Sequence, residues 1–163
     1  HGCWRKATRR LYKACKEKGI MLLKLNRFVV SDIIEDDPVR PHITAEWRTD
    51  HNREVFGLYE DESFETLRSV ICVAYTDTIP THEDDMNVIG RHTAVFYTVW
   101  SYDPGAGREI VRTVAEHIKQ HHKSVIRYVT LSPLTVMAER FHTRNGAKLI
   151  FKHDTCQNFE YTI

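Results

Sequence analysis

Three small residues, Gly105, Ala106 and Gly107, stand between a strand-like run and the start of a helical pattern. A glycine turn in this place presents backbone N–H groups beside the positive end of a helix dipole, where phosphate groups bind proteins. Glycines also occur in strand-to-helix turns only because they permit the backbone geometry. The turn therefore predicts a phosphate-bearing ligand, with a plain turn as the alternative.

His142 is the second residue whose type is suited to chemistry. An unperturbed histidine titrates near neutral pH, so its ring can give or accept a proton during a reaction. It lies in a helical pattern beside Phe141, where a histidine can equally be an ordinary surface residue. A catalytic and a structural role for His142 both stay open on the residues alone.

Both candidates lie in the stretch 97–147, which predicts a strand, a turn, a helix, a strand and a helix. The helix after the turn has its apolar residues on one stripe, as an amphipathic helix requires. Asn145 and Gly146 are typical of the end of a helix. This order is a βαβ crossover with one further helix, so the turn and His142 belong to one structural unit.

The rest of the chain supplies the remaining strands of a sheet. We expect a hairpin over 54–75, a polar and mobile loop over 76–90, and a closing antiparallel pair over 147–161. The expected strands are 21–30, 54–60, 67–75, 93–100, 125–131, 147–152 and 157–161, and the expected helices are 31–37, 105–123 and 132–145. The predicted fold class is α/β, a single domain with a mixed, mostly antiparallel central sheet, flanking helices and a βαβα core.

The charge divides the chain into a basic arm over 1–20 and a mildly acidic domain over 21–163. The arm carries seven basic side chains and one acidic one, a net charge of +6, and the rest carries 16 basic and 21 acidic side chains, a net charge of −5. The arm predicts contact with nucleic acid or another acidic surface, or else a solvated helix or sequence outside the domain. The acidic balance disfavours nucleic-acid binding by the domain itself.

The four cysteines are widely spaced and form no C-x-x-C motif. No apolar run has the length of a membrane span, and no signal peptide is visible. Free thiols in a chain without a secretion signal predict a reducing compartment. We expect a cytoplasmic protein that does not bind membranes, with oligomerisation left open.

Two segments of the stretch 97–147 carry a family resemblance. Tyr102–Gly107 matches the spacing Q/R-x-x-G-x-G/A, with Tyr102 in place of the leading glutamine or arginine. Ala138–Ala147 resembles A-x-x-L/F-Y-x-K/R-x-G-F/A, with His142 in place of the tyrosine. Both patterns resemble signatures of the GCN5-related N-acetyltransferase (GNAT) superfamily, and the expected order of elements over 21–163 is similar to that of the superfamily. The resemblance implies a GNAT-like domain that binds acetyl-CoA or another acyl-CoA.

The resemblance also implies a role for each matched position. The acyl group would pass directly to an amine acceptor of unknown identity, and His142 would protonate or stabilise the departing CoA thiolate, as the family's tyrosine often does. The parallel strands 93–100 and 125–131 would splay to admit the pantetheine arm. The residues expected to bind the cofactor are Val99, Trp100, Tyr102, Gly105, Ala106, Gly107, Arg108 and Ser132.

A second resemblance implies a different reaction. The segments Thr130–Pro133 and Arg140–Ala147 are similar to the GNAT-fold domain of malonyl-CoA decarboxylases. In that reading His142 acts with a hydroxyl group, for which Thr98 and Ser101 are the candidates. The whole pattern further resembles uncharacterised GNAT-like proteins of tailed phages, which implies the host cytoplasm. It leaves open a third function, a binding or virion protein that keeps the fold without the chemistry.

Acyl transfer to an amine also needs a group that takes the proton of the amine. The expected strand 93–100 has no carboxylate, and the candidates elsewhere are Glu46, Glu60, Asp77 and His92. Two further histidines, His117 and His121, have the i, i+4 spacing of metal ligands. The glutamate of an HExxH motif is missing, however, so we expect no metal.

Overall fold

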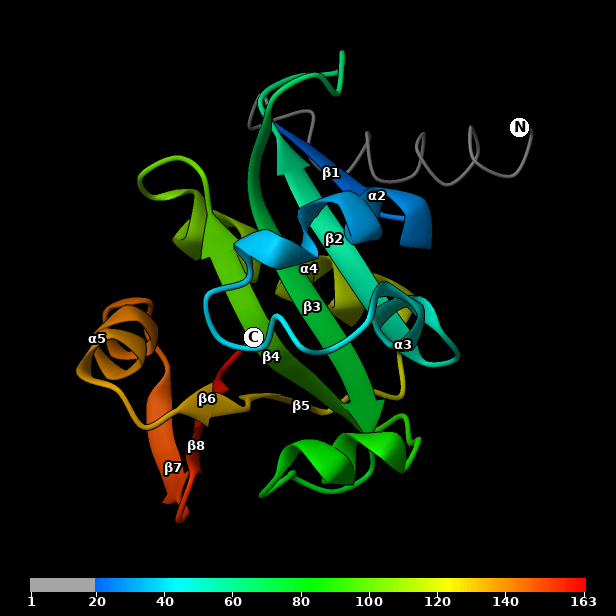
Figure 1. Cartoon of the computed structure of the whole chain (residues 1–163). Helices are drawn as coiled ribbons and strands as arrows, with labels where there is room; N and C mark the ends of the chain where they lie inside the picture. The colour runs from blue at the N-terminus through cyan, green and yellow to red at the C-terminus, as the bar shows by residue number, and fades with distance from the viewer. Residues whose placement is uncertain (1–19) are drawn as a thin grey trace.

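The computed structural model describes residues 20–163, and the basic arm, apart from its last residue, lies outside this range (Figure 1). Its centre is a mixed sheet in the order β1-β2-β3-β4-β5-β8-β6, with β7 paired to β8. The strands are β1 (Met21–Lys24), β2 (Arg53–Tyr59), β3 (Leu67–Thr76), β4 (Thr93–Ser101), β5 (Arg127–Thr130), β6 (Ser132–Pro133), β7 (Lys148–Lys152) and β8 (Cys156–Tyr161). Only β4 and β5 pair in parallel among the described strands. The predicted α/β class with a mostly antiparallel sheet is confirmed.

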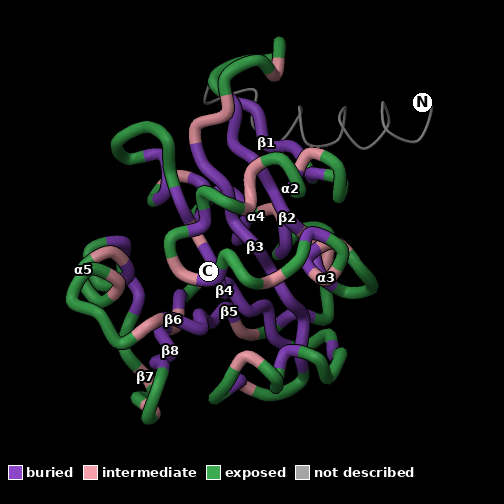
Figure 2. Tube along the Cα trace, in the orientation of Figure 1, coloured by how far each residue is buried: buried purple, intermediate pink, exposed green. Residues whose placement is uncertain are grey.

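The helices are α2 (Arg27–Ile33), α3 (Ala45–Thr49), α4 (Ala106–His121) and α5 (Val136–Arg144), with 3-10 turns η2 (Ile34–Asp36) and η3 (Glu83–Asn87). Helix α4 packs its apolar stripe on one face of the sheet, and α2 and α3 cover the other face. Strand β3 contributes to both cores, because Ile71 and Val73 face α4 while Val70 and Cys72 face the opposite side. This explains the continuous apolar run Val70–Ala74 within β3, and Figure 2 shows the trace of β3 buried along most of its length.

The first predicted strand is too long. Strand β1 ends at Lys24, and Phe28–Val30 lies in α2 instead. The side chain of Asn26 accepts hydrogen bonds from the backbone N–H groups of Phe28 and Val29, both at 3.0 Å, and so caps the helix. The helix thus starts four residues before the predicted start at Ser31, because the cap at Asn26 outweighs the β propensity of the valines.

The predicted helix over 132–145 begins too early. Ser132 and Pro133 form β6 with β8, and Thr135 caps α5 by accepting from the N–H of Ala138 at 3.2 Å. Met137, which the helical pattern predicts to face inward, is 82 % exposed. The predicted end of the helix is confirmed, since Asn145 is the C-cap and Gly146 has a φ of 94°.

The segment 76–90, predicted as a polar and mobile loop, contains η3 and forms hydrogen bonds with distant parts of the chain. The side chain of Asn158 donates to Pro80 O at 3.0 Å, and the indole of Trp47 donates to the side chain of Asn87 at 2.8 Å. The segment therefore connects the region of α3 to the C-terminal hairpin β7–β8. No helix in the described part of the chain has the length and apolar character that crossing a bilayer requires.

Candidate acyl-CoA site

The candidate site begins where β4 and β5 part. Their parallel pairing runs from Thr93 and Arg127 to Phe96 and Thr130, and one more hydrogen bond joins Leu131 N to Phe96 O at 3.2 Å. Strand β4 continues to Ser101, whereas the chain after β5 turns away to pair with β8 as β6. The splay that the family resemblance implies is therefore present, and it opens a cleft between the two strands.

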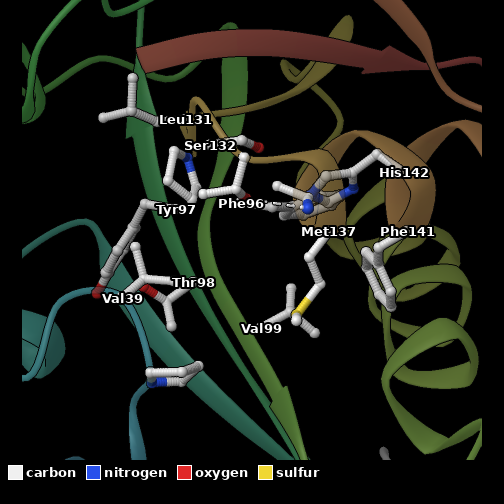
Figure 3. A pocket seen from close by; sticks show the side chains of 14 residues that line it. Val39, Phe96, Tyr97, Thr98, Val99, Leu131, Ser132, Met137, Phe141 and His142 are labelled. Carbon is white, nitrogen blue, oxygen red and sulfur yellow. Dashed lines mark hydrogen bonds between the residues drawn. The ribbon is translucent and has the colours of Figure 1, made fainter. Parts of the chain in front are cut away.

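The cleft contains a cavity of about 530 Å³ (Figure 3). Its walls come from β4, from the chain after β5, from α5 and from the segment after η2. The lining residues are Pro38, Val39, Phe96, Tyr97, Thr98, Val99, Leu131, Ser132, Pro133, Thr135, Met137, Ala138, Phe141 and His142. None of them is Asp, Glu, Lys or Arg, so His142 is the one lining residue whose unperturbed side chain would titrate near neutral pH.

A second cavity of about 490 Å³ continues the cleft toward the glycine turn. It shares Pro38, Val99, Met137 and Phe141 with the first cavity and extends to Asp36, Trp100, Ser101, Tyr102 and Gly107. The two cavities therefore form one groove with the turn at one end and His142 at the other. Val99 and Phe141, which lie about 40 positions apart in the sequence, both line this groove.

The glycine turn lies at the start of α4, as its sequence predicts, but the N–H of Ala106 already donates to Asp103 O at 3.1 Å and is not free for a ligand. Gly105 is the N-cap of α4 with a φ of 82°, a left-handed conformation that other residues adopt only at a cost. Within the described chain, the backbone N–H groups of Gly105, Gly107 and Arg108 have no backbone acceptor. A Cβ at Gly107 would lie 3.3 Å from the ring of Phe141, so a glycine allows α4 and α5 to pack closely here. The turn thus offers N–H donors to an anion.

Tyr102, the unusual residue of the turn, both donates and accepts a hydrogen bond, whereas an arginine could only donate. Its hydroxyl donates to the carboxylate of Asp36 at 2.6 Å and accepts from the indole N–H of Trp100 at 2.9 Å. Burial and the bond to Asp36 raise the pKa of Tyr102 to about 12, so the phenol stays uncharged. Tyr102 therefore joins β4 to η2 and adds no positive charge. Arg108, the expected charged residue of the turn, donates to Arg144 O at 3.2 Å.

His142 lies on the side of α5 that faces the cleft and is 7 % exposed. Its Nδ1 is 2.7 Å from the hydroxyl of Tyr161 on β8, and its ring stacks on Phe159 with 5.3 Å between centroids. Burial lowers the pKa of the imidazole to about 4. The ring is therefore neutral at physiological pH and can donate one N–H without carrying a charge.

The hydroxyl candidates lie at different places. Thr98 lines the cavity and is 3 % exposed, yet within the described chain its Oγ1 has no hydrogen-bond partner. Ser101 lies farther along β4 and lines the second cavity. Ser132 lines the first cavity, with its hydroxyl 2.8 Å from that of Thr130. Thr98 and His142 thus face the same space from β4 and α5, as Figure 3 shows.

A β-bulge in β4 shapes the cleft beside Thr98. Cys72 of β3 pairs with Thr98 and Val73 pairs with Phe96, which leaves Tyr97 as the extra residue. The carbonyl of Tyr97 accepts a hydrogen bond from the guanidinium of Arg40. Arg40 also donates to Glu83 of η3 at 2.9 Å. The bulge is therefore held by a side chain from the segment that forms the opposite wall.

This wall depends on a buried ion pair that sequence reasoning did not find. Asp37 Oδ2 accepts from Arg48 Nη1 at 2.8 Å, and both side chains are fully buried. The other oxygen of Asp37 accepts from the N–H groups of Val39 and Arg40 at 2.8 and 2.9 Å. Two charged residues 11 positions apart carry no local signal, because only the tertiary structure places them together.

The proposed bases do not gather at the cleft. None of Glu46, Glu60, Asp77 and His92 lines either cavity. Asp77 and His92 pair with each other at 2.9 Å at the start of β4, whereas the glycine turn follows its end. His117 and His121 stack on each other at 4.2 Å, and no group of three or more metal-ligand side chains forms within residues 20–163.

Two kinds of solved structure, a decarboxylase and an acetyltransferase, share the fold of this chain. Malonyl-CoA decarboxylase from Agrobacterium vitis matches with a TM-score of 0.70 and 16 % identity over 96 % of this chain and 63 % of that one. The PaiA N-acetyltransferase from Thermoplasma acidophilum, solved with coenzyme A, matches with a TM-score of 0.63 and 12 % identity over 88 % and 99 % of the two chains. The chain has a GNAT-like fold.

The Campylobacter jejuni N-acetyltransferase PseH also shares this GNAT-like fold, with a TM-score of 0.59 and 13 % identity over 88 % of this chain and 97 % of that one. The chain thus spans nearly the whole length of the acetyltransferases but less than two thirds of the A. vitis decarboxylase. No family model and no curated protein matches the sequence. The likeness is therefore one of fold.

Proposed function

We propose that the domain binds an acyl-CoA in the groove and transfers the acyl group to an amine. The single observation that carries this proposal is the continuity of the groove from the glycine turn to His142. An acyl-CoA molecule has a charged pyrophosphate at one place and a long, weakly polar arm that ends in the thioester. The groove offers backbone donors at one end and an uncharged lining at the other.

The residues fit this ligand chemically. The N–H groups of Gly105, Gly107 and Arg108 would hold the pyrophosphate through the helix terminus. The apolar side chains of Val99, Met137 and Phe141, shared by both cavities, would contact the pantetheine arm. With Tyr102 engaged by Asp36, the affinity would come from backbone donors and apolar contact more than from side-chain charge.

His142 would act at the thioester end. A bound thioester supplies an activated acyl group whose sulfur leaves as a thiolate. The neutral ring can place an N–H toward developing negative charge in a site with no competing carboxylate. No residue of the cavity is suited to remove a proton from an ammonium ion, so the acceptor would have to enter as a free amine or lose its proton to water.

A second candidate function is decarboxylation of a carboxyacyl-CoA, and the hydroxyl of Thr98 favours it. Breaking the bond between the carboxylate and the α-carbon releases CO2, leaves the electron pair on the α-carbon and the thioester oxygen, and requires a proton to be added. An uncharged cavity would disfavour the localised carboxylate. Rotation about χ1 of Thr98 would turn its unpartnered hydroxyl into the cavity, and His142 would donate to the thioester oxygen.

One set of assays separates these functions. Acetyl-CoA should raise the melting temperature, because a ligand that binds the native state stabilises it. Acyl transfer should release free CoA thiol from acetyl-CoA in the presence of an amine panel, whereas decarboxylation should convert malonyl-CoA to acetyl-CoA by mass spectrometry without an acceptor. His142→Ala should abolish either activity and keep the thermal shift. An unchanged melting temperature with millimolar acetyl-CoA, malonyl-CoA and CoA would overturn both proposals.

A further inference from the structure

A chain of three buried polar side chains ends at His142. Asn145 Nδ2 lies 3.4 Å from Arg108 O and 3.5 Å from the hydroxyl of Tyr161. The hydroxyl of Tyr161 lies 2.7 Å from His142 Nδ1. The three side chains are 5 %, 2 % and 7 % exposed in the order Asn145, Tyr161, His142, so bulk water cannot replace these partners.

The direction of each hydrogen bond follows from the groups involved. Arg108 O is a backbone carbonyl that can only accept, so the atom of Asn145 that faces it must be the amide nitrogen. The same NH2 group faces Tyr161, whose oxygen therefore accepts. Within the described chain, His142 Nδ1 is the one remaining partner for the phenolic proton. Tyr161 thus donates to Nδ1, which must be the unprotonated nitrogen of the ring.

The other ring nitrogen must then carry the proton. The ring is buried between aromatic side chains, with Phe159 stacked at 5.3 Å and Phe141 edge-on at 4.9 Å between centroids, and no charged group of the described chain shifts its pKa. A neutral imidazole has one N–H, which Nδ1 lacks and Nε2 therefore holds. Nε2 has no hydrogen-bond partner in residues 20–163 and is not sealed from solvent as the Nδ1 of His117 is.

We propose that Tyr161 is a positioning residue that fixes His142 in the tautomer with the proton on Nε2. Its effect on the reaction rests on the function proposed above, because only a reacting thioester would use this N–H. The tautomer itself does not depend on that function. In the opposite tautomer Nε2 would accept a proton, so Tyr161 decides whether the cavity contains a donor or a base.

The hydrogen-bond network also connects His142 to the glycine turn. Arg108, whose carbonyl accepts from Asn145, belongs to the first turn of α4. Arg112, one turn later, donates to Asn145 O, and its guanidinium lies 5.7 Å from the centroid of the Tyr161 ring. The groups that would hold the pyrophosphate and the group that would act on the thioester are therefore part of one hydrogen-bonded unit.

The test is the tautomer of His142 by NMR. In protein with 15N-labelled histidine, long-range 1H–15N correlations distinguish protonated from unprotonated ring nitrogens, and the signals of His142 are those missing in His142→Gln. We expect a protonated Nε2 and an unprotonated Nδ1 at pH 7. In Tyr161→Phe the donor to Nδ1 is lost, so the two tautomers should exchange.

Tyr128→Phe is the matched control. Tyr128 pairs with Tyr161 across β5 and β8, and its hydroxyl makes no hydrogen bond in the described chain. This variant should keep the tautomer of the wild type. A proton on Nδ1 in the wild type, or an unchanged tautomer in folded Tyr161→Phe, would overturn the proposal. If acyl-CoA turnover is found, Tyr161→Phe should lower kcat by about tenfold or more with unchanged CoA affinity. The NMR result stands even if no turnover is found.

Discussion

The carboxylate of Asp37 lies 2.8 Å from the guanidinium of Arg48, and neither side chain reaches solvent. This pair holds the wall of the cleft through the backbone N–H groups of Val39 and Arg40. Removing one partner would leave the other charge buried without compensation. We expect Arg48→Ala to lower the free energy of unfolding by about 3–5 kcal/mol, measured by urea denaturation.

The matched control is Arg127→Ala. Arg127 pairs with Glu160 at 2.7 Å, but its side chain is 42 % exposed. This loss should cost only about 0–1 kcal/mol. Equal costs for the two variants would contradict the assignment of Asp37 and Arg48 as the pair that supports the wall.

The hydroxyl of Thr98 should lower the free energy of unfolding of the domain. Its buried hydroxyl has no partner in the described chain, and an unsatisfied buried polar group costs about 1–3 kcal/mol. Thr98→Val replaces the hydroxyl with a methyl of similar shape, so it should raise the melting temperature. Thr130→Val should do the opposite, because Thr130 Oγ1 accepts from Phe159 N at 3.0 Å. A lower melting temperature for Thr98→Val would show that its hydroxyl has a partner.

Gly105 should be needed for both stability and CoA binding. Its φ of 82° is left-handed, so Gly105→Ala should cost about 1–2 kcal/mol and displace the N–H groups of the turn. We expect weaker CoA binding by calorimetry. Gly90→Ala is also destabilising, because a Cβ there would lie 2.2 Å from Asp77 N, but Gly90 lies before β4. The folded fraction of that variant should bind CoA normally, and weakened binding would argue against a local effect of the turn.

Glu54 should contribute to acid stability. Burial acts to raise the pKa of its carboxyl, but hydrogen bonds from His122 and Tyr75 and the charge of Lys24 outweigh burial and lower the pKa to about 2. A carboxyl whose folded pKa lies below its usual value of 4.5 adds stability above pH 4.5 and loses it as the pH falls toward 2.

Free energies of unfolding measured between about pH 2.5 and about pH 5.5 test this contribution, because Glu54 should lose its stabilising charge within this range. Glu54→Gln should flatten the pH dependence of stability in this range. Glu116→Gln, the same change at an exposed position of α4, should leave it unchanged. A wild-type slope in Glu54→Gln would exclude Glu54 as its source.

The strands and the glycine turn could be predicted because their signals are local. The apolar run of β3 is continuous, and the apolar residues of α4 recur with the helical period. A glycine at position 105 is typical of the left-handed backbone conformation that this residue adopts. The predicted start of α2 was wrong because a single capping residue, Asn26, determines where this helix begins. Ser132–Pro133 looked like a helix start, but its pairing with β8 depends on residues more than 20 positions away.

The candidate site was predictable only in part. His142 and the turn follow from two motifs, but the partners that define their chemistry come from elsewhere in the chain. Tyr161 lies 19 positions after His142, and Asp36 lies 66 positions before Tyr102. Hydrogen bonds between side chains at such separations have no sequence period. The charged candidates Glu46, Glu60, Asp77 and His92 failed to converge for the same reason.

The four-residue parallel pairing of β4 and β5 is the one place where the antiparallel strands β1–β4 meet the strands β5–β8 within the described sheet. The groove opens directly beyond this pairing. Two groups of strands joined by so short a pairing can separate locally at a lower free energy than the unfolding of either group requires. A ligand that contacts Val99 on one side and Phe141 on the other would span both groups. Its binding should therefore slow amide hydrogen exchange in the paired residues of β4, from Thr93 to Phe96, more than in the hairpin β2–β3.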